Sequence, residues 1–150
     1  MDQDAFRKTY RDMNDRFCLF EKSILSGQCG CALAERFCLA EREGVHCRAD
    51  EAQEQCQNLL GLLRRHSRFT LKSSDETGNL SHAKAMRLQI GGLRGLHASI
   101  HEGDPPASIE DIHDLINQAV KAFNGLDHLP FQEIIKQIAA YKGRSRRSRG

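Results

Sequence analysis

The sequence predicts an all-α protein, a single-domain bundle of five or six helices with a cysteine-rich N-terminal part. Helix-forming Ala, Leu, Gln, Glu, Arg and Lys are plentiful, whereas β-branched residues are sparse and there are only 3 prolines. Apolar residues also recur at helical spacing through most of the chain. At 150 residues the chain is long enough for one domain with a substantial core.

Two helices are predicted in the N-terminal third. The first covers residues 3–26, where an apolar stripe with steps of three and four residues ends at Gly27. The second covers residues 32–43 and ends at Gly44, followed by a short loop at 45–47. Between the two helices, residues 27–31 are expected to form a tight glycine-containing turn that can approach a bound centre closely.

Two further helices are predicted in the middle of the chain. One runs from about Asp50 to His66, with its basic end suited to the helix dipole. A loop is expected at 72–80, and Ser81 then caps a helix that runs to about His101. Three glycines inside this helix, each costing roughly 1 kcal/mol relative to alanine, indicate close packing of another helix against a small-residue face. They are Gly91, Gly92 and Gly95.

The C-terminal part completes the predicted bundle. Ser108 opens a fifth helix as a near capping box, and Gly125 ends it. A last helix follows Pro130, with an isoleucine-rich inner face. The predicted helical domain therefore spans residues 1–142, and residues 143–150 form a basic, flexible tail.

All six cysteines fall within residues 18–56, with the spacing C-x10-C-x-C-x6-C-x8-C-x8-C. Core packing alone gives no reason for such crowding, so the sequence predicts a thiolate site. The first residues are acidic and no apolar run resembles a signal peptide or a membrane span, so we expect a cytoplasmic protein without a membrane association. In that compartment clustered cysteines bind metal or do redox chemistry more often than they form disulfides.

An iron–sulfur cluster of the 4Fe–4S type is the leading interpretation, because a cubane takes four thiolates and tolerates wider ligand separation than a bare ion. The most compact set of cysteines supplies the expected ligands. Cys18 flanks the apolar stripe of the first predicted helix and Cys56 shares the leucine face of the third, so both resemble core thiols. The predicted cluster and metal ligands are Cys29, Cys31, Cys38 and Cys47, with Cys18, Cys56 and His46 as possible substitutes.

Other interpretations of the cysteines stay open. Zinc is the alternative metal, although the usual C-x2-4-C knuckles are absent and His46 would have to serve as a mixed ligand. Cys29 and Cys31 could form a thiol switch. Cys18, Cys38 and Cys56 could each simply be a small buried hydrophobe.

The predicted function is that of a small iron–sulfur, metal-binding protein that senses redox state or passes electrons to a protein partner. The alternative is a zinc-stabilised or metal-free helical interaction module whose arginine tail, residues 143–150, contacts nucleic acid or an acidic protein. A net charge of +2 does not by itself indicate nucleic acid. The sequence shows no catalytic signature, so enzymatic activity stays open. His97 and His101 share a predicted helix face, where they are better explained as core-edge residues than as metal ligands.

Overall fold

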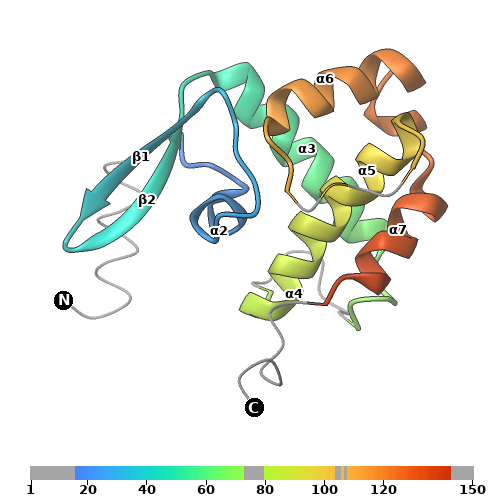
Figure 1. Cartoon of the computed structure of the whole chain (residues 1–150), viewed down its shortest axis with the longest axis horizontal. Helices are drawn as coiled ribbons and strands as arrows, with labels where there is room; N and C mark the ends of the chain where they lie inside the picture. The colour runs from blue at the N-terminus through green and yellow to red at the C-terminus, as the bar shows by residue number, and fades with distance from the viewer. Residues whose placement is uncertain (1–15, 73–79, 104–105, 107, 143–150) are drawn as a thin grey trace.

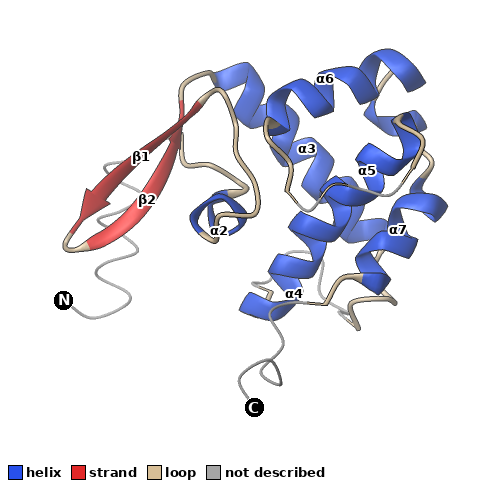
Figure 2. Ribbon diagram, viewed as in Figure 1, coloured by secondary structure: helices blue, strands red, loops and turns tan. Residues whose placement is uncertain are grey.

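The computed structural model describes residues 16–72, 80–103, 106 and 108–142. In these residues helices pack beside a two-stranded antiparallel sheet, and the sheet projects from one side of the molecule (Figures 1 and 2). The prediction of an all-α fold is therefore wrong, and the chain is mixed α and β. None of the described helices has the length and apolar character needed to cross a membrane.

The described elements follow the chain from the sheet-bearing end to the helical end (Figure 1). The helices include one π-helical segment, η1, and one short 3-10 segment, η2. In order, the elements are α2 (Glu21–Leu25), β1 (Ala34–Leu39), β2 (Arg42–Cys47), α3 (Asp50–His66), α4 (His82–Met86), η1 (Arg87–Gly91), α5 (Gly92–Ile100), α6 (Ile112–Phe123), η2 (Leu126–His128) and α7 (Phe131–Ala140).

The hairpin of β1 and β2 replaces the helix predicted at 32–43 and the loop predicted at 45–47. Its two-residue connection places Ala40 at φ 50° and Glu41 at φ 68°, a left-handed conformation that these helix-forming residues rarely adopt. Pairing with a distant segment overrides this local preference, because β2 also forms an antiparallel bridge to residues 16–18. Burial of Val45, which is 0% exposed, adds to the preference for the strand.

The turn at Ala40 and Glu41 offers a test of the hairpin. A left-handed conformation costs roughly 1–2 kcal/mol per non-glycine residue, and Asn-Gly is the preferred pair in such turns. We therefore expect the double variant Ala40→Asn, Glu41→Gly to raise the free energy of unfolding by about 1 kcal/mol, as measured by urea denaturation. Glycine at the exposed strand position Glu35 should instead lower it. A hairpin variant that is less stable than the parent protein would contradict the hairpin.

The helix predicted at 3–26 is present only in part. Residues 1–15 lie outside the described residues, and residues 16–18 are extended because Phe17 pairs with His46. The helix that remains is α2, which ends before Gly27 at φ 84°. The predicted glycine stop is therefore confirmed, and the helix predicted over residues 16–20 is corrected to an extended segment at 16–18 followed by a turn at 19–20.

The later helices agree more closely with the sequence. The bounds of α3 are those predicted, and Ser81 caps α4, its side chain accepting a hydrogen bond from the Lys84 N–H. The segment α4–η1–α5 runs on as predicted, with a π-helical turn that places the buried Gln89 side chain to accept from the Ser23 hydroxyl at 2.6 Å. The fifth helix begins later than predicted, at α6, because the Asp111 side chain and not that of Ser108 accepts a first-turn N–H.

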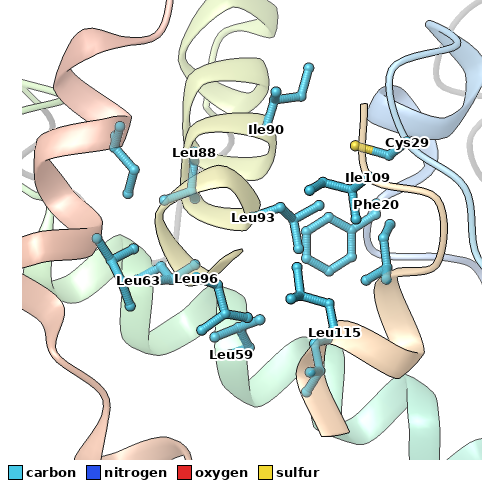
Figure 3. Close-up of a cluster of buried hydrophobic side chains, with 14 of the residues drawn as sticks. Phe20, Cys29, Leu59, Leu63, Leu88, Ile90, Leu93, Leu96, Ile109 and Leu115 are labelled. Carbon is cyan, nitrogen blue, oxygen red and sulfur yellow. The ribbon is translucent and has the colours of Figure 1, made fainter. Parts of the chain in front are cut away.

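The hydrophobic core lies between the helices and reaches the sheet-bearing end through α2. Figure 3 shows Phe20, Leu93, Ile109 and Leu115 packed together, with the Cys29 sulfur beside them. Phe20 and Leu93 are 0% exposed. The core therefore joins the cysteine-rich segment to the helical part as one packed unit.

Candidate metal centre

Four of the six cysteines line one pocket between the sheet-bearing end and the helices. They come from separate parts of the fold: the extended segment before α2, the loop before β1, the end of β2 and the second turn of α3. Apart from Gln53 and His113, the other lining residues are apolar. The pocket is lined by Cys18, Leu19, Phe20, Cys31, Leu33, Ala34, Cys47, Ala52, Gln53, Cys56, Ile112 and His113.

Backbone pairing brings Cys18 and Cys47 together. The Cys18 N–H donates to the Val45 carbonyl at 2.9 Å, and the Cys47 N–H donates to the Arg16 carbonyl at 2.6 Å. Successive side chains in a strand alternate between faces, so Cys18 and Cys47 lie diagonally on the same face of this short ladder. His46 lies on the opposite face, which explains why this predicted substitute ligand is not among the pocket-lining residues.

The loop that carries Cys31 is fixed against the start of α6. The Gly30 N–H donates to the Ile109 carbonyl, and the Ile112 N–H donates to the Gly30 carbonyl, both at 2.8 Å. A side chain at Gly30 would bring a Cβ within 2.8 Å of the Glu110 carbonyl oxygen, so this position requires glycine. A close backbone approach to a bound centre was expected at Gly30. The structure instead shows a close approach to the segment 109–112.

Cys56 faces the pocket from α3. It lies three residues after Gln53 and four residues after Ala52, and both of these line the same pocket from the same helix face. The Gln53 side-chain amide donates to the Phe17 carbonyl at 2.9 Å and thereby ties α3 to the segment that carries Cys18. The same helix face that was predicted to hold Cys56 in the leucine core thus presents it to the pocket.

The pocket thiols influence one another's ionisation. Burial, followed by the neighbouring Cys31, Cys47 and Glu21, raises the pKa of the Cys18 thiol from 9.0 to about 12, although the Phe20 N–H partly opposes this. Burial and then the other three pocket cysteines raise the pKa of Cys56, also to about 12. Four thiolates in an apolar pocket would repel one another, so their deprotonated form requires a bound cation.

The two remaining cysteines lie elsewhere. Cys29 is 7% exposed and packs in the core, where burial raises its pKa to about 11 (Figure 3). Cys38 is exposed on β1, close to the tip of the hairpin. Of the four predicted ligands, the structure therefore brings together Cys31 and Cys47, and it adds Cys18 and Cys56, which were named as substitutes.

Comparison with protein families, with curated proteins and with solved structures finds no match for this chain. The pocket is therefore interpreted from its own chemistry. His113 was not indicated by the sequence, because its distance from the cysteines along the chain gave no signal; only the contact between Gly30 and the start of α6 brings it to the pocket.

Among the residues that the structure describes, no three His, Cys, Asp or Glu side chains form a group that could hold a metal ion. His97 and His101 do share a helix face as predicted, with ring centroids 4.5 Å apart, and His101 Nε2 lies 2.8 Å from Gln118 Oε1. This histidine pair thus has a protein partner and no third ligand in the described part of the chain.

Proposed function

We propose that the protein is a small iron–sulfur protein whose cluster is held by Cys18, Cys31, Cys47 and Cys56, and that it senses redox state or passes electrons to a partner protein. The observation that carries this proposal is the convergence of four thiols from four separate segments on one pocket with a largely apolar lining. Thiols that served only as small core residues would have no reason to converge in this way.

The spacing of the four thiols along the sequence favours a cluster over a single zinc ion, because Cys18, Cys31, Cys47 and Cys56 form no C-x2-4-C knuckle. A zinc ion with Zn–S bonds of about 2.3 Å draws its thiolates to within about 3.8 Å of one another. A [4Fe–4S] centre bonds each thiolate to a different iron atom, so its four sulfurs surround a larger volume. A site of four thiols and no carboxylate suits iron–sulfur chemistry and zinc alike, so metal analysis has to distinguish them.

The ligand count favours electron transfer or sensing over catalysis. Four cysteine ligands leave each iron atom of a cubane without an open position for a substrate. The largely apolar lining supplied by Leu19, Phe20 and Ile112 limits water access, which is one of the factors that set a cluster's reduction potential. An electron can pass to a partner protein without a substrate entering the pocket.

Other parts of the prediction remain proposals. We infer a cytoplasmic, reducing compartment, in agreement with the free cysteines of the described chain. The arginine tail at 143–150 lies outside the described residues, so its contact with nucleic acid or an acidic protein stays a prediction. If the tail binds nucleic acid, affinity should fall as salt concentration rises.

Colour and metal content test the proposed cofactor. Protein purified without oxygen, or reconstituted with ferrous iron and sulfide, should be brown and should contain iron and acid-labile sulfide in equal amounts. Exposure to a chelator and an oxidant should bleach it. A colourless protein with one zinc ion per chain would support the zinc-stabilised module in its place, and a colourless protein without metal would support the metal-free interaction module.

A further inference from the structure

Positive charge is concentrated in one part of the chain. The whole sequence holds 22 Lys and Arg against 20 Asp and Glu, but residues 55–101 hold 7 against 2, the two acids being Asp75 and Glu76. Residues 134–142 add Lys136 and Lys142 and contain no acid. The small net charge of the chain therefore conceals a basic region, and the fold decides whether its cations form one surface.

The fold brings these basic segments together at one end of the molecule. The Lys84 ammonium of α4 donates to the Lys72 carbonyl beyond α3 at 3.3 Å, and the Arg87 guanidinium of η1 donates to the Ala139 carbonyl of α7 at 3.2 Å. Figure 1 shows α4 and the ends of α3 and α7 in the lower half of the molecule, with α6 at the opposite end. We refer to five cations there, all exposed or partly exposed, as the basic end: Arg65, Arg68, Lys72, Lys84 and Arg87.

An exposed aromatic ring belongs to the same surface. Among the residues that the structure describes, Phe69 is the only large hydrophobic side chain that lies exposed, and it is 86% exposed. The Arg68 guanidinium carbon lies 5.3 Å from the Phe69 ring centroid, which is a cation–π contact. The helix dipole favours arginines in the last turn of α3, but it gives no reason for a phenylalanine to lie in water beside them. The ring and the cations together match a ligand with both flat rings and negative charge.

We propose that the basic end binds single-stranded nucleic acid, with Phe69 as the platform on which a base stacks and the cations as contacts to the phosphates. Proteins that bind single strands combine a positively charged surface with aromatic rings, because every base has a flat face whatever the sequence. A double helix keeps its bases stacked inside, out of reach of Phe69. A membrane surface suits these residues less well, since interfacial binding requires a broad apolar face. This surface is separate from the tail at 143–150, and the proposal does not depend on a bound cluster.

Two probes of equal charge separate stacking from charge attraction. One is a fluorescein-labelled oligothymidylate of about 15 nucleotides, within the roughly 4–16 nucleotides that a single-strand site covers, and the other is an abasic deoxyribose-phosphate chain of the same length. In fluorescence anisotropy with the full-length protein at low salt, we expect Phe69→Ala to weaken oligothymidylate binding by about 5- to 150-fold, the loss typical of a stacking ring. Binding of the abasic chain should be weaker than that of oligothymidylate and should not change with Phe69→Ala.

Because Phe69 is exposed, the alanine variant should unfold at the same urea concentration as the wild type, so a loss of affinity would not come from unfolding. A Phe69→Ala protein that binds oligothymidylate as tightly as the wild type would place binding elsewhere, for example on the tail, and would overturn the proposal. Wild-type protein that does not bind oligothymidylate at low salt would overturn it as well.

The double variant Arg65→Gln, Lys72→Gln tests the phosphate contacts. Each contact to a single strand contributes about 0.7 to the slope of log affinity against log salt concentration, so the slope should fall by about 1.4. The charge-matched control is Arg42→Gln, Lys121→Gln, with one change on β2 and one on α6, and it should keep the wild-type slope. Equal effects of the two double variants would show attraction to net charge alone and contradict the proposal. Equally tight binding of polyglutamate or of phosphatidylserine vesicles would assign the surface to an acidic protein or a membrane instead.

Discussion

Serine at Cys18 or at Cys56 is expected to abolish cluster binding, whereas serine at Cys38 should leave it unchanged. Cys18 and Cys56 line the pocket, whereas Cys38 is exposed on the hairpin. Serine lacks the thiolate that iron requires, so the variant should remain colourless after reconstitution with ferrous iron and sulfide. Iron content and visible absorbance, compared with those of the wild-type protein, measure the loss.

Cys29 provides the sharper control because it is buried but lies outside the pocket. Cys29→Ser places a hydroxyl in the core, which should lower the free energy of unfolding by about 1–3 kcal/mol if the hydroxyl finds no partner. The variant should nevertheless stay brown at a temperature where it is folded. If serine at Cys29 or Cys38 abolished cluster binding, and serine at Cys18 or Cys56 did not, the ligand set predicted from spacing would be favoured. That result would overturn the ligand set proposed from the structure.

The sequence was sufficient to predict those helices in which the apolar periodicity and the residues at the helix ends indicate the same bounds. For α3 and α7, a regular apolar stripe coincides with suitable ends, and Ile134 and Ile138 are buried as predicted. The hairpin was not predictable in this way, because Ala40 and Glu41 are helix-forming residues in a turn that normally contains glycine or asparagine. The pairing that stabilises β2 comes from residues 16–18, far from the turn in sequence.

The helix wrongly predicted at 32–43 also explains why the predicted ligands differ from the cysteines that line the pocket. All six cysteines lie in the segment 18–56, and four of them line the pocket, but a thiolate site there stays a prediction. In a helix at 32–43, Cys38 could have returned to the site of Cys31, but in β1 it lies towards the hairpin tip. Pairing of β2 with the extended segment brings in Cys18, and the start of α3 directly after β2 brings in Cys56. Assigning the ligands therefore required the strand register.

The glycines of the helical part make the most demanding packing contacts. A Cβ at Gly95 would lie 2.7 Å from the Ile134 Cα, and a Cβ at Gly91 would lie 2.7 Å from the Ile138 Cα. Because both obstacles are backbone atoms of α7, they cannot be relieved by a side-chain rotation. The sequence-based explanation, close approach of another helix to a small-residue face, is confirmed at these two positions.

Alanine at Gly95 is therefore expected to destabilise the protein by about 2–3 kcal/mol, since α5 and α7 must separate and the core contacts between them are weakened. This loss outweighs the gain of roughly 1 kcal/mol that alanine brings to a helix. Gly61 in α3 is the matched control: nothing lies within 4 Å of a Cβ built there, so Gly61→Ala should stabilise the protein by that gain. Urea denaturation of the two variants beside the wild type measures both effects. If both alanines stabilise the protein, α5 and α7 do not pack as closely as the structure places them.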